Sequence, residues 1–371
     1  MQEQLRDVYL TLINASKFFI RIYRQLGNML VLSSSILTLN AQRNFLKQVL
    51  QVTSDSDVDP QAVYPLLQEN LALLDENLAR VLHEFGRQLA DHEAEEAEKL
   101  ATDIINFSNL LQEFPLGDQA INQEIAITGY QVALTICSRP INSETWALIQ
   151  NNLGLAYFNR IRGEKTENIE NAITSYQAAL EIYTREYFPR DWAMNQVCLG
   201  LAYSNRIGGE GAENIENAIT SYQAALEIYT REAFPVNYTE TQLNLGIAYQ
   251  NAKKLSHAYQ AFTAAINIIE SQTLEMNVDI IDDIEHPKIA PEWNDVYHKM
   301  LELCLMLADH TQSINDIASS SSDFIELLNT RNLLSDGKIQ SQPNSQVKQQ
   351  QQYILMNDFH EVLQIIKLIY K

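Results

Sequence analysis

Histidines, cysteines and clustered carboxylates are the side chains of this 371-residue sequence that can support catalysis or bind a metal. The seven histidines form no HExxH pair, and none lies next to a cysteine; they are at positions 83, 92, 257, 286, 298, 310 and 360. Cys137, Cys198 and Cys304 have no metal-ligand or redox spacing. The acidic stretches Glu93–Glu98 and Asp282–Asp283 do not follow a calcium-loop pattern and are interpreted as solvated surface. We therefore expect no enzymatic activity, with no catalytic residue, no metal ligand and no cofactor.

Asparagines that recur at a fixed spacing are the better candidates for recognition. Asn159, Asn205 and Asn251 follow one another at intervals of 46 residues. With the residues near them they form the predicted partner-binding set, which is Asn151, Leu155, Phe158, Asn159, Val197, Leu201, Asn205, Leu243, Ile247 and Asn251. An amide side chain can bond the backbone of a bound peptide, and it can equally cap its own helix and bond the following turn. Both interpretations stay open from the sequence.

Two other patterns have structural explanations. Arg139, Arg185 and Arg231 follow the same period at the predicted ends of helices, where a basic side chain is favourable without any ligand. The glycine-rich stretch RIGGEG at Arg206–Gly211 follows a helix and lacks the GKS or GKT of a phosphate-binding loop. We interpret it as a flexible turn.

The elements that must position these residues are repeated. ENIENAITSYQAALEIYTRE occurs twice without a change, at Glu167–Glu186 and Glu213–Glu232. LGLAY at Leu153–Tyr157 recurs at Leu199–Tyr203 and, as LGIAY, at Leu245–Tyr249. A fixed period of 46 residues predicts a stacked array, in which each repeat packs on its neighbours.

Each repeat is predicted to be a pair of helices. The first, helix A, runs from Trp146, and the second, helix B, runs from about Asn168. The small residues Gly154 and Ala172 let the two backbones approach, and Tyr157 and Tyr176 fill the space beside them. Neither helix can bury its apolar stripe alone, so stacking stabilises the pair.

These positions resemble the tetratricopeptide repeat (TPR), with its Trp, Leu-Gly, Tyr, Ala, aromatic and Ala pattern. In the third copy Tyr249 precedes Ala258 by nine residues, as in the usual TPR of about 34 residues. The two earlier copies have fifteen residues at this point, so six extra residues lie in the turn between helices A and B. The resemblance implies an all-α fold: a right-handed α-solenoid of TPR helix-turn-helix repeats with a 46-residue period, preceded by an N-terminal helical region.

The expected organisation has four parts. Residues 1–99 form the N-terminal helical region, in which one helix carries heptad-spaced apolar residues for packing within the chain, at Leu67, Leu71, Leu74, Leu78, Val81 and Phe85. Residues 100–270 form the TPR array, with a degenerate repeat at 100–138 and clear repeats at 146–184, 192–230 and 238–270. Residues 271–335 are a linker and a degenerate terminal repeat, and residues 336–371 are a Gln/Ser-rich tail with a short terminal helix.

Charge and composition restrict the partners. The formal net charge of −21 argues against nucleic acid, which requires a basic face, and against anionic membrane surfaces. The start of the sequence has no signal-peptide pattern, and three dispersed cysteines fit a reducing compartment, so we expect a cytoplasmic location. The expected partner is a protein or peptide, with self-association as a further option.

Longer stretches resemble the cyanobacterial-type TPR proteins that often carry a C-terminal caspase-like protease domain, the CHAT family. They include VYPLLQENLALLDENLA at Val63–Ala79, INFSNLLQEFPLG at Ile105–Gly117 and REYFPRDWA at Arg185–Ala193. In that family a protease with a His–Cys dyad follows a TRNL-like segment. After Leu334 this sequence has His360 and no cysteine, so protease activity is not expected to carry over.

The sequence thus predicts a non-enzymatic interaction scaffold that binds a peptide or protein in the concave groove of a TPR array. The alternative is a regulatory or sensor fragment of a caspase-like (CHAT) protease system whose catalytic domain is lost or separately encoded. A purely structural, self-associating array is the third interpretation.

Overall fold

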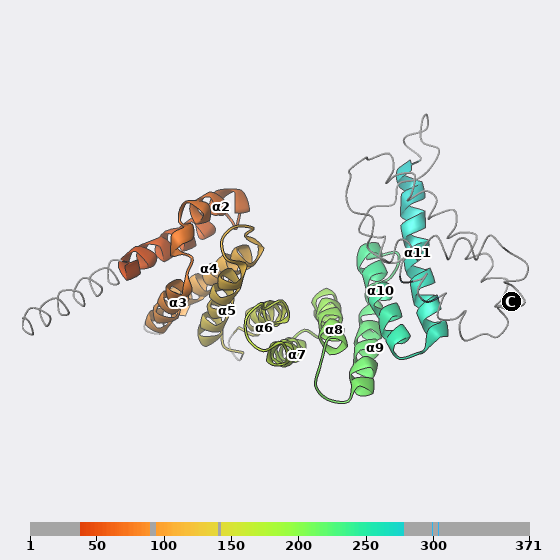
Figure 1. Ribbon diagram of the computed structural model, residues 1–371. Helices are drawn as coiled ribbons and strands as arrows, with labels where there is room; N and C mark the ends of the chain where they lie inside the picture. The colour runs from red at the N-terminus through yellow and green to blue at the C-terminus, as the bar shows by residue number, and fades with distance from the viewer. Residues whose placement is uncertain (1–37, 90–93, 140–141, 278–298, 300–302, 304–371) are drawn as a thin grey trace, which may run out of the picture. The chain divides into compact units, whose positions relative to one another are not determined.

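A computed structural model describes residues 38–89, 94–139 and 142–277, together with Lys299 and Leu303. Within these ranges the chain forms helices and no strand, and consecutive helices pack as pairs (Figure 1). The predicted all-α fold of TPR-type helix-turn-helix repeats is therefore confirmed. No helix among the described residues is both long and apolar enough to cross a membrane.

The helices follow the sequence in antiparallel pairs. A helix over residues 38–55 comes first, followed by α2 (Pro60–Glu69), the short 3-10 helix η1 (Leu71–Leu73), α3 (Glu76–Leu89), α4 (Ala94–Glu113), α5 (Gln119–Ile136), α6 (Ser143–Phe158), α7 (Lys165–Leu180), α8 (Pro189–Ser204), α9 (Gly211–Leu226), α10 (Pro235–Asn251) and α11 (Leu255–Asn277). The pairs α4–α5, α6–α7, α8–α9 and α10–α11 coincide with the helix A and helix B segments of the 46-residue period.

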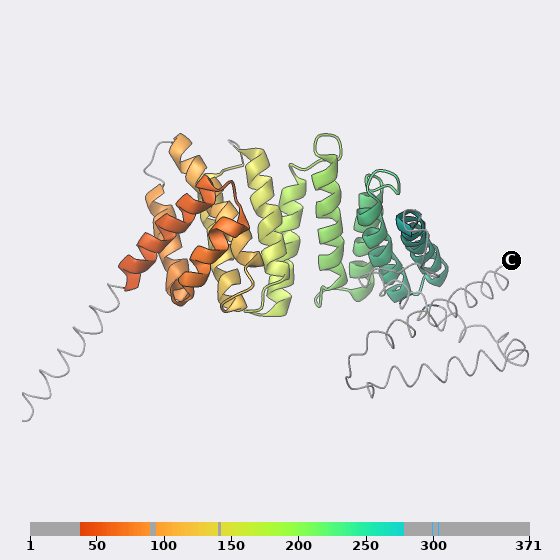
Figure 2. The same cartoon turned by 90° about the horizontal axis from the view of Figure 1, so that it is seen from above.

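The chain divides into two compact units, Met1–Tyr187 and Phe188–Lys371. The first unit contains α2 to α7 and the second contains α8 to α11. Seen from above, the paired helices of each unit lie side by side (Figure 2). The boundaries of the four parts expected from the sequence remain proposals.

Close approach of the paired helices depends on glycine opposite a large side chain. A methyl group built on Gly154 would stand 2.6 Å from a carbon of the Tyr176 ring, and one on Gly246 would stand 2.4 Å from the Phe262 ring. The degenerate pair reverses the arrangement, because Ser108 is on α4 and the glycine, Gly129, is on α5. The predicted role of Gly154 and Tyr176 is thus confirmed.

The core of the first unit joins its N-terminal helices to α4 and α5. Leu46, Leu67, Leu78, Phe107 and Leu111 are almost completely buried in one cluster. The heptad-spaced residues Leu67, Leu74, Leu78 and Val81 belong to this cluster, so they pack within the chain as expected. In Figure 1 these N-terminal helices lie beside α4 and α5.

The expectation of one helix from Leu67 to Phe85 is wrong. The chain leaves the α-helix at Asn70, forms η1, and begins α3 after Asp75. The Asp75 carboxylate accepts hydrogen bonds from the backbone N–H groups of Asn77 and Leu78, which starts a new helix. Gln42, on the helix over residues 38–55, donates to the Leu73 carbonyl and to Asp75. A buried amide from another helix thus supplies hydrogen bonds to the backbone and the cap at the break. Apolar spacing alone did not detect this cap.

The second unit has a continuous core over α9, α10 and α11. Tyr222, Leu245, Phe262 and Ile266 are buried in it. Leu303 is also fully buried in this cluster, so the part of the chain predicted as a degenerate terminal repeat contributes to the core of the second unit. The remainder of that repeat, the first 37 residues of the predicted N-terminal helical region, the Gln/Ser-rich tail and the terminal helix lie outside the described residues, apart from Lys299.

Candidate functional site

The predicted partner-binding residues of the first unit lie on α6. Leu155 and Asn159 are exposed, and Phe158 is half-buried. Asn151 is buried instead, and its amide donates to the Asn152 side chain at 3.2 Å. Asn159 is the C-cap of α6, and its carbonyl oxygen accepts a hydrogen bond from the Gln123 side chain at 3.0 Å. The four residues therefore share a helix but differ in access to solvent.

The predicted residues of the second unit come from α8 and α10. Val197, Leu201, Leu243 and Ile247 are half-buried against one core cluster, so the structure brings these four together. Asn205 is exposed as the C-cap of α8, and its amide donates to the Leu201 carbonyl of its own helix at 2.9 Å. Asn251 is exposed as the last residue of α10. The helix-capping interpretation therefore has a direct contact at Asn205.

A chain of amide and hydroxyl groups connects α4, α5 and α6. Gln112 donates to the Tyr130 hydroxyl, which donates to the Asn109 side chain at 2.6 Å. Asn109 also accepts from Asn152 at 3.0 Å. Burial raises the pKa of Tyr130 above its ordinary range, so the phenol stays a neutral donor. The side-chain oxygen of Asn151 is buried at the end of this chain and accepts no hydrogen bond.

The A helices of the three clear repeats, α6, α8 and α10, carry almost no charge after their first turns, although one residue in five of the whole sequence is charged. Residues 145–159 of the first unit have no Asp, Glu, Lys or Arg, and neither do residues 192–205 and 241–252 of the second. Leu148 and Leu155 on α6 are each about two-fifths exposed, at 41% and 42%. Sequence reasoning missed Leu148 and its register equivalent Met194, although their seven-residue spacing from Leu155 and Leu201 could have identified them.

The turns between helices A and B share a hydrogen-bonded construction. Gly117, Gly163 and Gly209 have left-handed backbones, with φ of 83°, 80° and 78°. An asparagine five residues later donates to the carbonyl just before each glycine: Asn122 to Leu116, Asn168 to Arg162 and Asn214 to Gly208, at 2.9, 2.7 and 2.7 Å. The stretch interpreted from the sequence as a flexible turn is therefore closed by a buried amide. The 46-residue spacing of these asparagines was the signal that sequence reasoning overlooked.

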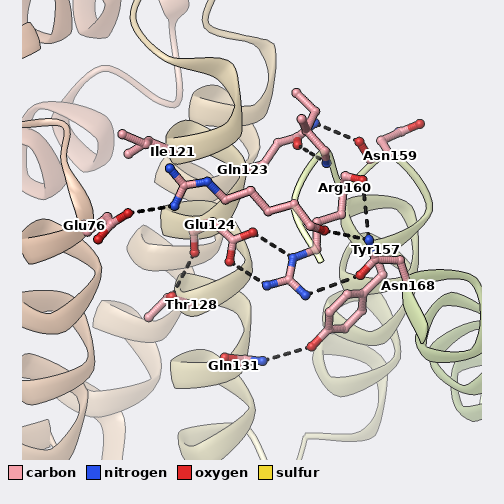
Figure 3. A network of polar contacts seen from close by, with 12 residues as sticks. Glu76, Ile121, Gln123, Glu124, Thr128, Gln131, Tyr157, Asn159, Arg160 and Asn168 are labelled. Carbon is pink, nitrogen blue, oxygen red and sulfur yellow. Dashed lines mark hydrogen bonds and ion pairs between the residues drawn. The ribbon is translucent and has the colours of Figure 1, made fainter. Parts of the chain in front are cut away.

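The longer turn of the first unit is bonded to the preceding helix pair. Arg160 makes two hydrogen bonds to the Glu124 carboxylate, each of 2.7 Å, and a third to Asn168 (Figure 3). Hydrogen bonding to Glu124 raises the pKa of Arg160 above its already high value. Gln123 accepts from the Ile161 N–H at 2.9 Å. The side chain of Gln131 on α5 donates to the Tyr157 hydroxyl on α6, which makes a second polar contact between these two helices.

The corresponding contact in the second unit is simpler. Lys254 donates to both oxygens of Glu216, at 2.6 and 2.9 Å. Gln223 donates to the Tyr249 hydroxyl at 2.8 Å, in the register of Gln131 and Tyr157. Of the helix-end arginines, Arg139 of the first unit pairs with Glu181 and lies 5.6 Å from the centre of the Trp146 ring. These contacts explain the charges by packing between repeats.

Metal binding finds no support in the described part of the chain. No group of three or more His, Cys, Asp or Glu side chains there is arranged to hold an ion. Cys137 is buried, and burial raises the pKa of its thiol, which disfavours the reactive thiolate. The arrangement favours surface recognition through apolar and amide groups.

Comparison with known proteins places a similarity on the repeat region. Residues 145–279 match the family described as SNAP, Soluble NSF attachment protein. The matched stretch contains most of α6, all of α7 to α11, and 135 of the 371 residues. Among solved structures, BtubC (BKLC) from P. vanneervenii is 19% identical with a TM-score of 0.36, and the alignment covers 68% of this chain and 96% of that one. No curated protein matches significantly.

Proposed function

We propose that the protein is a non-enzymatic scaffold that binds a protein or peptide segment on the exposed face of its A helices. The observation that carries the proposal is the absence of charge from residues 145–159, combined with the exposure of Leu148 and Leu155. Exposed aliphatic groups and amides on a face without charge fit a segment recognised by apolar burial and backbone hydrogen bonds. The similarity to a family named for attachment to another protein supports the same general role.

The predicted binding set enters this proposal with different weights. Leu155, Phe158 and Asn159 are accessible on α6, and Asn205 and Asn251 are accessible at the ends of α8 and α10. Val197, Leu201, Leu243 and Ile247 offer only the minor part of their surface that the core leaves open. Asn151 is buried, so its contribution in this proposal is to position Asn152, to which its amide donates a hydrogen bond.

Affinity capture from the protein's own cell extract, followed by titration of the captured partner, tests the proposal. Leu155→Asp should weaken binding by about tenfold or more, because it places a charge in an apolar contact. Replacement of Asn159, Asn205 and Asn251 by alanine together tests the amide contribution. Asn267→Ala, an exposed change on α11, is the matched control. Unchanged affinity in the Leu155→Asp protein with an intact circular dichroism spectrum would sink the proposal.

The second reading, a regulatory or sensor fragment of a caspase-like (CHAT) protease system, rests on the sequence stretches at Val63–Ala79, Ile105–Gly117 and Arg185–Ala193. It requires a protease partner. Capture of a caspase-like protein that binds through α6 would favour this reading over a general adaptor.

A further inference from the structure

Three exposed aliphatic side chains of the first unit lie on turns and not on the A-helix face. Leu71 belongs to η1, Leu116 to the α4–α5 turn and Ile161 to the α6–α7 turn. Their exposed fractions are 37%, 39% and 62%. We call these three residues the turn-edge patch.

Contacts place the three turns next to one another. A methyl group built on Gly117, beside Leu116, would be 3.5 Å from a methyl carbon of Leu71. Arg162, beside Ile161, pairs with Glu76 at the start of α3 at 2.9 Å, which links the α6–α7 turn to the segment just after η1. Figure 3 shows Glu76 and the α5 residues Gln123 and Glu124 gathered at this turn. The patch is therefore one edge of the unit, assembled from segments about 90 residues apart in sequence (161 − 71).

The α6–α7 turn presents Ile161 on a fixed backbone. Its N–H is bound by Gln123, the neighbouring Arg160 side chain is held by Glu124, and the Arg162 carbonyl accepts from Asn168. A turn whose backbone is fixed before binding loses little backbone entropy when a partner covers it. The hydrogen bonds thus hold an aliphatic side chain in water, where burying it against a partner is favourable.

Carboxylates lie close in sequence to the residues of the patch. Glu69, Glu113, Asp118 and Glu164 are exposed next to the three turns, and no ion pair engages them within the described residues. Arg162 is already paired with Glu76, and Lys165 is the exposed cation nearest to Ile161 in sequence without such a pair. The rim is therefore negative around an apolar centre, which selects a partner with the opposite pattern.

We propose that the turn-edge patch is a second docking surface, which binds a partner-protein segment whose aliphatic residues are flanked by lysine or arginine. A second copy of this chain fits poorly, because two molecules with a formal charge of −21 repel each other. This surface is separate from the A-helix face, so it does not depend on the function proposed above.

The second unit supplies a matched control. Ile207 occupies the register of Ile161 and is 65% exposed. The positions one and two periods after Leu116 are Arg162 and Gly208, and neither is aliphatic. The sequence around Ile207 therefore has no equivalent of Leu116. Ile207→Asp changes an equally exposed isoleucine without altering the patch.

The test uses the full chain and a phage-displayed library of random peptides of about a dozen residues. Peptides selected on the wild-type chain and counter-selected on the Ile161→Asp variant should contain aliphatic residues flanked by lysine or arginine. For the enriched peptide, once synthesised, Ile161→Asp and Leu116→Asp should each lower affinity by about tenfold or more, and Ile207→Asp by less than about twofold. Added salt should weaken binding, and hydrogen exchange should show protection at residues 69–76, 114–118 and 159–165.

Several results would overturn the proposal. These are no enrichment over the Ile161→Asp variant, enriched peptides rich in acidic residues, or equal losses from Ile161→Asp and Ile207→Asp. A dimer in sedimentation that Ile161→Asp dissociates would assign the patch to a second copy instead. Leu155→Asp should leave the selected peptide bound, so failure here and failure of the A-helix proposal are distinguishable.

Discussion

Two junctions between neighbouring repeats use a glutamate at the same repeat position with different cations. One joins α5 to the α6–α7 turn, and the other joins α9 to the end of α10. In the first unit Glu124 binds the two-pronged guanidinium of Arg160, and both side chains are only about a quarter exposed, at 23% and 24%. In the second unit Glu216 binds the single ammonium of Lys254, and both are about half exposed, at 53% and 41%. The glutamine–tyrosine bond below each pair is the same, Gln131 with Tyr157 and Gln223 with Tyr249.

The difference follows from the length of the turn. Where six extra residues separate helices A and B, Gln123 and Asn168 bind the added backbone, and the Arg160 side chain donates to Asn168. Where the turn is short, Lys253 adopts a left-handed backbone with φ of 58° and one lysine completes the junction. The packing of the repeats therefore tolerates a change in turn length, and the extra residues become a fixed surface feature.

The largest expected effect is on the contact between a helix A glycine and a helix B aromatic ring, which occurs in each unit. Gly154→Val and Gly246→Val should each lower the free energy of unfolding by about 3 kcal/mol, because a side chain there would overlap an aromatic ring. Denaturant unfolding with hydrogen exchange in α6–α7 and α10–α11 measures the two effects separately. Gly211→Ala is the control, since open space surrounds that position. A loss in only one unit would contradict a common packing rule.

The second expected effect concerns the hydrogen bonds that close the two long turns after α6 and α8. Asn168→Ala and Asn214→Ala should each cost about 2 kcal/mol, because partly buried turn carbonyls lose their donor. Hydrogen exchange should accelerate first in the turns at residues 159–164 and 205–210. Asn267→Ala on the exposed face of α11 should change stability by less than about 0.5 kcal/mol. Equal effects from Asn267→Ala and Asn168→Ala would mean that the turn bonds do not stabilise the fold.

The smallest expected effect tests the two ion pairs against each other. Glu124→Gln should cost about 1 kcal/mol, because it removes charge from a bidentate and partly buried pair. Glu216→Gln should cost less than about 0.5 kcal/mol, because its pair is exposed and screened by salt. Thermal unfolding at low and high salt measures both, with the Glu216→Gln effect vanishing at high salt. Equal costs at both sites would remove the distinction between the junctions.

The repeat could be predicted closely because its signals are local in sequence. The spacing of Leu153, Gly154 and Tyr157 and its recurrence after 46 residues identify helix pairs, and Gly154 opposite Tyr176 follows from their need to approach. The break at Asn70–Asp75 was missed because its cap depends on Gln42, from another helix, and apolar periodicity continues through it. The exposed state of Leu155 and the buried state of Asn151 were not distinguishable, since both lie on the same helix at positions expected to face the groove.

By itself the sequence determined the all-α repeat fold, the helix pairing and the uncharged stretches at residues 145–159, 192–205 and 241–252, because each depends on residue type and spacing within one chain segment. Only the tertiary structure decided which residues meet across repeats. Arg160 with Glu124, Arg162 with Glu76, and Leu71 beside Gly117 join segments that are far apart in sequence. No local pattern encodes these pairs, because they exist only after the helix pairs have stacked and brought their turns to one edge.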